Sequence, residues 1–440
     1  MDVTPPRAAS DAPSTTPGAP GPRPPRRASI PDEGPALRPI SRAELEQRFH
    51  TQADGADSVV DDGVGATGTT VPAEPSSRGP ELDVVFCIDC TGSMGSYIKA
   101  AKKSIGTIAR TLVEQEGYDL RVGVVAYRDY NDTDGPGPFT TFPFTSRIEE
   151  MEAYFASLSA SGGRQQDGAE AVEEGLKRAA WMEWRTNIQT KICILIGDAP
   201  PHGLGEWDDD YPDGPPTETD VMLVLDGMAS RGIVVYAVGC QPTLSTSYEY
   251  GVDFWVAAAE KTFGRAIALG APSSLPDVVI GGLREEMDLE PVLLEGIWAW
   301  THEVRKQHPD LDEVDVEDAV YRSLCATSAR EVRRLEVSEL QSDRAWHVSK
   351  ASTLKEARLL LRASKEPEGV CVDATASPAA TYRSMSALDP APAAPAAPAA
   401  PAAPAAPAAP TLVPVTLHTG EMTRAQFDRM YKRAMEQGIV

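Results

Sequence analysis

The sequence has few cysteines, no excess of basic residues and no long apolar run. Six cysteines in 440 residues are too few for a disulfide framework. A net charge of −24 argues against a nucleic-acid backbone or an anionic membrane surface as partner, because both are recognised by Lys and Arg. No stretch of about 18 apolar residues predicts a membrane span, and the start, MDVTPPRAAS, lacks the apolar segment of a secretory signal. We therefore expect a cytoplasmic protein.

The positions of the cysteines also favour a reducing compartment. Cys87, Cys193 and Cys240 lie in or at the end of apolar runs, where a free thiol behaves as a small hydrophobic group. Cys87 and Cys90 form a CxxC pair, but at the end of an expected strand. A redox-active pair lies at a helix N-terminus, so the pattern argues against that role.

Composition divides the chain into five parts. Residues 1–80 are rich in Pro, Ala, Ser, Gly and Asp and are predicted to be disordered, apart from a capping-box helix start at Ser41–Glu44. Residues 81–290 have the pattern of one folded domain, and residues 291–370 that of a helical extension. Residues 371–420 are an expected disordered linker, whose Ala/Pro repeats would span roughly 60 Å at about 3.1 Å per residue.

The last part, residues 421–440, has the pattern of an amphipathic tail helix. Thr423 and Gln426 form a capping box, and Phe427, Met430 and Tyr431 share one face. Such a helix on a semi-rigid tether can dock into a groove of its own chain or of another. A helix that only folds back or frays is the alternative.

The domain at 81–290 alternates short apolar runs with helical stretches. Continuous apolar runs are typical of strands that are covered on both faces. Strand–helix repeats predict an α/β fold with a doubly wound, mostly parallel sheet flanked by helices. The expected strands are 82–89, 120–127, 188–198, 233–240 and 266–270, and the expected helices are 94–112, 147–158, 168–182, 218–231 and 248–263.

The first expected strand ends in a cluster of oxygen donors. Asp89, Thr91 and Ser93 alternate on the strand-to-helix turn, at the sheet edge where ligands of parallel sheets gather. A carboxylate and two hydroxyls suit a hard cation such as Mg²⁺ or Mn²⁺, whereas softer metals require Cys or His. The sequence therefore predicts a divalent-cation site at this turn.

The Asp-x-Thr-x-Ser pattern after an apolar strand resembles the metal-ion-dependent adhesion motif of von Willebrand factor A domains. FCIDCTGSMGSYI, VAYRDY and ILIGDAPPHG most resemble the branch found beside alpha-kinase and hemicentin-type proteins. The resemblance covers about residues 81–275 and implies a Rossmann-like fold. No alpha-kinase catalytic segment is recognisable in the rest of the chain, so kinase activity is not implied.

The resemblance also implies the ligand set. Asp89, Thr91 and Ser93 would bind the cation directly or through water, together with Asp198 after the strand ICILIGD. The family usually has a further Thr before a central helix, and Asp167 stands at the matching position. A third carboxylate would bind the cation more tightly and leave it less electrophilic toward an acidic ligand.

Each of these residues has a structural alternative. Ser93 can cap the following helix, Asp167 and Glu170 can form a capping box, and Asp198 can simply end a strand. The convergence of three separate chain segments on one sheet edge favours the metal site.

The neighbouring loops carry further acidic and aromatic residues. Asp129, Asp132 and Asp134 do not fit a calcium-loop template and are either a solvated acidic loop or, for Asp129, a support for the metal ligands. Trp207 is either an exposed anchor for a partner or a buried core residue, and His202 is a weak candidate ligand.

These features predict a non-catalytic module that holds a protein partner through a metal-bound Asp or Glu carboxylate. An alternative is a phosphotransferase of the haloacid-dehalogenase type, with Asp89 as the phosphorylated nucleophile. The residues after Asp198, Ala-Pro-Pro-His, lack the further Asp that this chemistry requires. A scaffold with a vestigial metal site is the third possibility.

Overall fold

The computed structural model of the chain describes residues 79–132, 137–162, 168–186, 188, 190–327, 331–364, 413–438 and 440. These residues belong to one compact unit. The expected disordered residues 1–78, with the helix start at Ser41–Glu44, lie outside the described residues, as do the Ala/Pro repeats.

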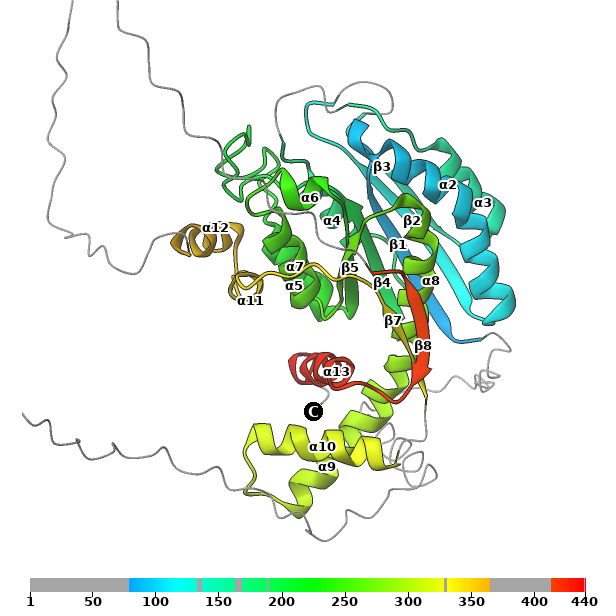
Figure 1. The fold of residues 1–440 in the computed structure, drawn as a ribbon, viewed down its shortest axis with the longest axis vertical. Helices are drawn as coiled ribbons and strands as arrows, with labels where there is room; N and C mark the ends of the chain where they lie inside the picture. Colours follow the sequence, from blue (N-terminus) through cyan, green and yellow to red (C-terminus); the bar gives the residue numbers. More distant parts are fainter. Residues whose placement is uncertain are drawn as a thin grey trace, which may run out of the picture. The chain divides into compact units, whose positions relative to one another are not determined.

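A six-stranded sheet in the order β3-β2-β1-β4-β5-β6 forms the centre of the fold (Figure 1). All of its strand pairs are parallel except β2–β3. All five predicted strands are present, with ends within two residues of those expected. The strands are β1 (Glu81–Asp89), β2 (Asp119–Tyr127), β3 (Phe139–Thr145), β4 (Thr190–Gly197), β5 (Ile233–Cys240) and β6 (Ala266–Leu269).

The antiparallel edge strand β3 was not expected from the sequence. Its residues FTTFPFT are mostly half-exposed, because only one of its long edges is paired. Pro143 lies in its interior, and an edge strand tolerates proline because one row of N–H groups needs no partner.

Helices cover both faces of the sheet, so the predicted doubly wound α/β architecture is confirmed (Figure 1). Their apolar stripes bury two separate cores, one on each face. One face carries α2 (Gly95–Arg110), α3 (Ile148–Ser157) and α8 (Leu275–Pro291). The other carries α4 (Val172–Ala180), α5 (Val221–Ser230) and α7 (Gly251–Lys261), and the short α6 (Thr243–Thr246) follows β5.

The expected helical extension after residue 290 contains more than helices. A π-helical segment (Val292–Ile297) joins α8 to α9 (Trp298–Gln307), which is followed by α10 (Glu313–Thr327). Strand β7 (Val332–Glu336) comes next, and α11 (Ala345–Ser349) and α12 (Leu354–Ala363) then add Ala345, Val348, Leu354 and Leu361 to the core beneath α5 and α7.

Between β7 and α11 the chain runs along the outer edge of the main sheet. Ser338 accepts a backbone hydrogen bond from Ala268 of β6 (2.9 Å), and Leu340 donates one to Ala266 (3.0 Å). We call residues 337–342 the edge strap. It covers the side of β6 that no other strand pairs with in the described sheet.

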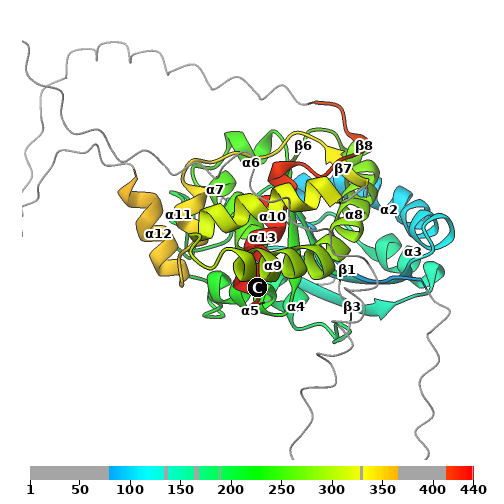
Figure 2. The same ribbon diagram turned by 90° about the horizontal axis from the view of Figure 1, so that it is seen from below.

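The tail begins before the predicted helix. Residues 416–420, assigned from the sequence to the disordered linker, form strand β8 (Thr416–Gly420), which pairs antiparallel with β7. That part of the linker prediction is wrong, because the partner strand lies in a different part of the chain. Helix α13 (Arg424–Glu436) follows, with the predicted capping box between Thr423 and Gln426. It lies against the segment from α8 to α10 (Figure 2).

Within the described residues, no helix has both the length and the apolar character needed to cross a membrane.

Candidate metal centre

The turn after β1 is held by the side chain of its last strand residue. Asp89 is fully buried, and its Oδ1 accepts hydrogen bonds from the backbone N–H (2.8 Å) and the hydroxyl (2.7 Å) of Thr91. The N–H of Cys90 donates to the carbonyl of Tyr127 at the end of β2 (2.8 Å). These bonds orient the Asp89 carboxylate toward the carboxyl edge of the sheet.

The predicted residues of two chain segments meet at this edge. Parallel pairing of β1 with β4 sets Ile88 opposite Ile196, so that Asp198 follows β4 beside the end of β1. The Ser93 hydroxyl donates to Asp198 Oδ1 (3.0 Å) and lies 3.2 Å from the Thr91 hydroxyl. Asp89, Thr91, Ser93 and Asp198 therefore form one continuous chain of oxygen atoms.

Two of the structural alternatives do not hold. Helix α2 has no side-chain cap, and the Ser93 hydroxyl is engaged with Asp198, so the helix-capping role of Ser93 is wrong. Helix α4 begins at Val172, and Glu170 instead donates its N–H to Pro200 (3.0 Å), so Glu170 does not complete a capping box. Asp167, the remaining candidate ligand, lies outside the described residues.

Two buried carboxylate oxygens at this edge have no hydrogen-bond partner among the described residues. They are Oδ2 of Asp89 and Oε2 of Glu170, whose side chains are almost completely inaccessible. An unsatisfied buried acceptor is costly and rare in folded proteins. The sequence indicated only a helix-capping role for Glu170. Its unpaired carboxylate oxygen could not be predicted, because the fold brings Glu170 to the carboxyl edge of the sheet.

The electrostatics of the edge reflect an excess of negative charge. Burial, and then the nearby Asp198, raise the pKa of Asp89 to about 7. Burial also raises the pKa of Asp198. The pKa of Glu170 is well above its ordinary value because of burial and the nearby Asp89, Asp129 and other carboxylates. A bound cation would neutralise this charge and satisfy the unpaired oxygens.

The donor set fits a hard divalent cation. It consists of oxygen atoms only, and Ser93 is exposed while Asp89 is buried, so the chain of donors leads from solvent into the sheet edge. Among the residues that the structure describes, no group of three or more His, Cys, Asp or Glu side chains has a metal-binding arrangement. The proposed ligands are two carboxylates and two hydroxyls and do not form such a group.

A second polar cluster supports the adjoining loops. The His202 imidazole is fully buried between Asp129 (Nε2 to Oδ1, 3.0 Å) and Asp209 (Nδ1 to Oδ1, 2.8 Å). The backbone N–H of His202 donates to the Glu173 carboxylate (3.3 Å). Burial acts to lower the pKa of His202, but the hydrogen bonds to the two aspartates raise it to about 10. Both of its ring nitrogens are engaged, so His202 is a loop anchor. The solvated-loop interpretation of Asp129 and Asp132 is wrong, since both are buried; Asp134 lies outside the described residues.

The remaining sequence alternatives are also resolved. The side chain of Trp207 is 86% exposed, which agrees with a surface anchor and not with a core residue. Cys87 and Cys90 are both buried, and burial raises the pKa of the Cys90 thiol to about 12, which does not suit a redox pair.

Residues 83–250 match the family model of the von Willebrand factor type A domain. Together with the parallel sheet and the Asp-x-Thr-x-Ser turn, this match establishes that the chain contains a domain of that family.

The similar proteins are larger and share only part of this chain. An alpha-protein kinase, vwkA, of Dictyostelium discoideum is 32% identical over 158 residues, which are 35% of this chain and 24% of that protein. An ariadne-like RING finger protein of Acanthamoeba polyphaga mimivirus is 26% identical over 197 residues, which are 43% of this chain and 18% of that protein. The chain thus spans a quarter or less of the length of these relatives.

Solved structures show a weaker likeness. A von Willebrand factor type A protein from Catenulispora acidiphila has 15% identity and a TM-score of 0.33, with 48% of this chain and 43% of that chain covered. The vWF domain of a type V pili tip protein from Porphyromonas gingivalis has 23% identity and a TM-score of 0.21, with 27% and 38% covered.

Proposed function

We propose that the domain is a divalent-cation-dependent protein-binding module that performs no chemistry on its partner. Asp89, Thr91, Ser93 and Asp198 would hold Mg²⁺ or Mn²⁺, and Asp167 would complete the set. A cation held in this way supplies an electrophilic position for an Asp or Glu carboxylate of the partner. The net charge of −24 is compatible with such a bridge, because a bound cation lets an acidic protein hold an acidic ligand.

The observation that carries the proposal is the orphaned Oδ2 of Asp89. This oxygen is buried, lacks a partner among the described residues and belongs to the side chain whose other oxygen is fixed by Thr91. A carboxylate oriented by two hydrogen bonds and left with one free buried oxygen is suited to bind a cation.

The phosphotransferase alternative is less well supported. Phosphotransfer of this type needs a further Asp a few residues after Asp198, and Ala199, Pro200, Pro201 and His202 stand there instead.

Calorimetric titration with MgCl₂ and MnCl₂ tests the metal site. We expect one cation per chain, with affinity lowered at least about tenfold, or about 1.4 kcal/mol, by Asp89→Asn and by Ser93→Ala. Ser104→Ala is the matched control, because its hydroxyl bonds only within α2, to the carbonyls of Ala100 and Ala101. Absence of heat with the unaltered chain would leave the vestigial scaffold as the better explanation.

A peptide-display selection in MgCl₂, with elution by EDTA, tests the carboxylate partner. We expect the recovered peptides to share an Asp or Glu whose replacement by Asn or Gln abolishes binding. Recovery of peptides that bind equally in EDTA would contradict the role of the cation. A base-labile label on the chain after incubation with radiolabelled phosphate donors, lost in Asp89→Asn, would instead favour the enzyme.

A further inference from the structure

We propose that Glu170 is a further residue of the metal centre, which holds a water molecule of the bound cation and so completes its surroundings on the buried side. This role rests on the proposed function, because the cation is the same one. Glu170 is not among the residues that the Asp-x-Thr-x-Ser turn and its matching aspartates supply.

Backbone hydrogen bonds fix Glu170 between the ends of two strands. Its N–H donates to the carbonyl of Pro200 on the loop that follows β4 (3.0 Å), and it forms an isolated β-bridge with Pro201. The next N–H, that of Ala171, donates to the carbonyl of Arg128, directly after β2 (3.3 Å). Glu170 is therefore held at the carboxyl edge of the sheet, where the candidate metal centre also lies.

The carboxylate of Glu170 is buried without a cationic partner among the described residues. Glu170 is 7% exposed, and its Oε2 accepts no hydrogen bond from them. The buried guanidinium of Arg128 is engaged elsewhere, since it donates to the carbonyls of Gly137 (3.1 Å) and Ser159 (2.6 Å). A buried carboxylate oxygen in this state is costly, and its presence points to a ligand that binds it.

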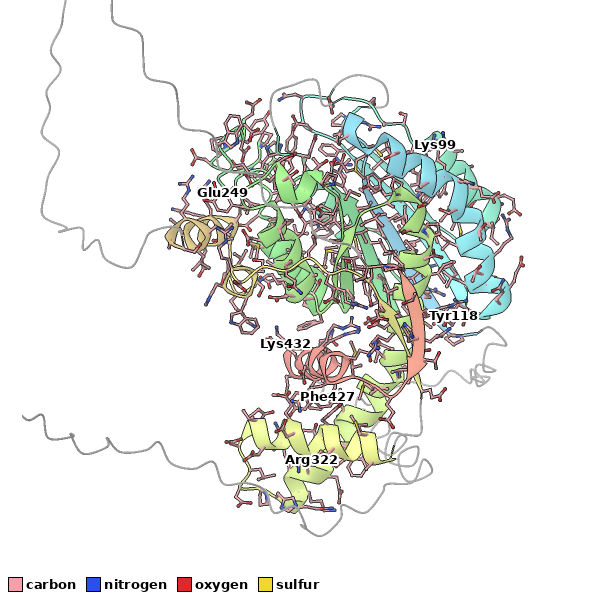
Figure 3. The ribbon with its side chains drawn as sticks, viewed as in Figure 1. Lys99, Tyr118, Glu249, Arg322, Phe427 and Lys432 are labelled. Atoms are coloured by element: carbon pink, nitrogen blue, oxygen red, sulfur yellow. The ribbon has the colours of Figure 1, made fainter. Side chains whose placement is uncertain are left out.

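The basic helix α13 does not reach this edge of the sheet. Figure 3 shows Lys432 of α13 at the opposite end of the sheet from Glu249, which follows the carboxyl end of β5. Glu249 is next to Tyr248, whose pKa is raised by burial and then by the nearby Asp198 and Glu170. Helix α13 therefore supplies no cation to Glu170.

Two further buried polar atoms beside Glu170 have no partner among the described residues. They are the hydroxyl of Tyr127, the last residue of β2, and Oδ2 of Asp89. A Cβ added to Gly197 would lie 2.7 Å from the Tyr127 hydroxyl and 3.2 Å from the Asp89 Cβ, so these two side chains meet beside Gly197. Burial, and then the nearby Asp89, Cys87 and Glu170, raise the pKa of Tyr127 well above its ordinary value. The three unpaired atoms thus form one cluster, which a hydrated cation would satisfy.

The spacing of the carboxylates favours a contact through water. Asp89, Asp198 and Glu170 are all described, and they do not form a group of three acidic side chains with a metal-binding arrangement. Glu170 is therefore not a third direct ligand. Mg²⁺ usually keeps several of its water molecules, and such a water can donate to a carboxylate oxygen roughly 4 Å from the ion. A contact of this kind fixes the water and raises the affinity for the cation.

The position of Glu170 also determines where a partner binds. The water held by Glu170 occupies the buried side of the cation, whereas Ser93 is exposed. The carboxylate of the partner would then replace a water on the side of Ser93, and the water at Glu170 would remain.

Stability and affinity should change in opposite directions when Glu170 is replaced. Glu170→Leu keeps a similar volume and removes the unpaired carboxylate. We expect the full chain with this change to melt at least about 2 °C higher in EDTA, because a buried unpaired charge is lost, and to bind Mn²⁺ at least tenfold more weakly in calorimetry. A glutamate with only a structural role would lower the melting temperature when replaced.

Glu174 provides the matched control, because it is a glutamate of α4 that is buried to the same degree but paired. It is 6% exposed and forms ion pairs with Lys177 (3.1 Å) and Arg178 (3.2 Å). Glu174→Leu should lower the melting temperature and leave the affinity for Mn²⁺ unchanged. Glu170→Gln, which keeps the shape and one acceptor oxygen, should weaken Mn²⁺ binding less than Glu170→Leu, and it replaces that variant if Glu170→Leu does not fold.

A crystal structure of the Mn²⁺ complex tests the water directly. We expect Oε2 of Glu170 roughly 4 Å from the ion, with one water between them. A direct bond, a separation beyond roughly 6 Å, unchanged Mn²⁺ affinity in the Glu170 variants, or a lower melting temperature of Glu170→Leu in EDTA would each overturn the role of Glu170 and leave the proposed function standing. An unaltered chain that binds no Mn²⁺ would overturn both.

Discussion

Replacement of His202 tests whether the buried charge network holds the loop beside the metal centre. The imidazole lies between the carboxylates of Asp129 and Asp209, with Glu173 close to its backbone. His202→Leu keeps a similar volume but leaves these carboxylates without their positive partner. Breaking a buried ion pair by removing one member costs about 3–5 kcal/mol, so we expect a loss of stability of that size at pH 7.

The raised pKa of His202, which has the same two hydrogen bonds as its cause, predicts how this stabilisation depends on pH. A value of about 10, against an ordinary 6.5, means that the folded chain binds the proton more tightly than the unfolded chain does. The stabilisation is therefore complete below pH 6.5 and is lost as the pH rises to about 10. At about 1.4 kcal/mol per pH unit the upper limit of this contribution is roughly 5 kcal/mol.

Urea denaturation from pH 6 to pH 10 provides the measurement. The difference in unfolding free energy between the unaltered chain and His202→Leu should be largest at pH 6 and shrink toward pH 10. Adding Asp209→Asn to His202→Leu should restore about 1–3 kcal/mol, because one uncompensated carboxylate is removed. A difference below 1 kcal/mol, or one that does not change with pH, would refute this account of the network.

Two further predictions concern other parts of the domain. Asp83→Asn should destabilise the chain by about 3–5 kcal/mol in urea denaturation, because its buried carboxylate pairs with Arg185 at 2.8 Å. Glu152→Gln, which removes an exposed ion pair, is the control and should change the free energy of unfolding by less than about 1 kcal/mol. Equal effects of the two substitutions would contradict the argument. Among the described cysteines, the exposed Cys325 should react rapidly with a maleimide in the native state, whereas the buried Cys87, whose thiol pKa is raised well above its ordinary value by burial, should react only on unfolding, as peptide mass spectrometry would show.

The strands and helices of the main domain could be predicted because their apolar periodicity is strong. The runs LDVVFCID and IVVYAVGC are buried on both faces and read as central parallel strands. The antiparallel β3 has the Phe- and Thr-rich composition of a strand, but the proline inside it weakens that signal, because a proline is compatible with an edge strand and with a loop. Strand β8 was missed for a different reason, since its partner β7 lies far away in the sequence.

The candidate site was predictable in part. Asp89, Thr91 and Ser93 are close in sequence, and Asp198 ends a strand at the same carboxyl edge and matches the later aspartate of the resembled family, so their meeting could be foreseen. The position of Glu170 could not be foreseen, because it depends on a backbone hydrogen bond to Pro200 for which the sequence has no local pattern.

The buried cluster of His202, Asp129 and Asp209 could not be predicted from a local sequence pattern either. His202 and Asp209 are separated by a loop rich in Gly and Asp, whose course is set by the buried pairing itself. The metal-ligand role of Asp167 stays a prediction.

The edge strap has a practical consequence for any attempt to isolate the domain. A fragment that stops at the family match, or at the expected boundary near residue 290, would strip residues 338–340 from β6. It would leave a row of unpaired amides and carbonyls on a parallel sheet, ready to recruit the same strand of a neighbouring molecule. If such a fragment were insoluble, the cause would be the exposed edge of β6 and not the absence of a ligand. Expression trials should therefore retain residues 79–438.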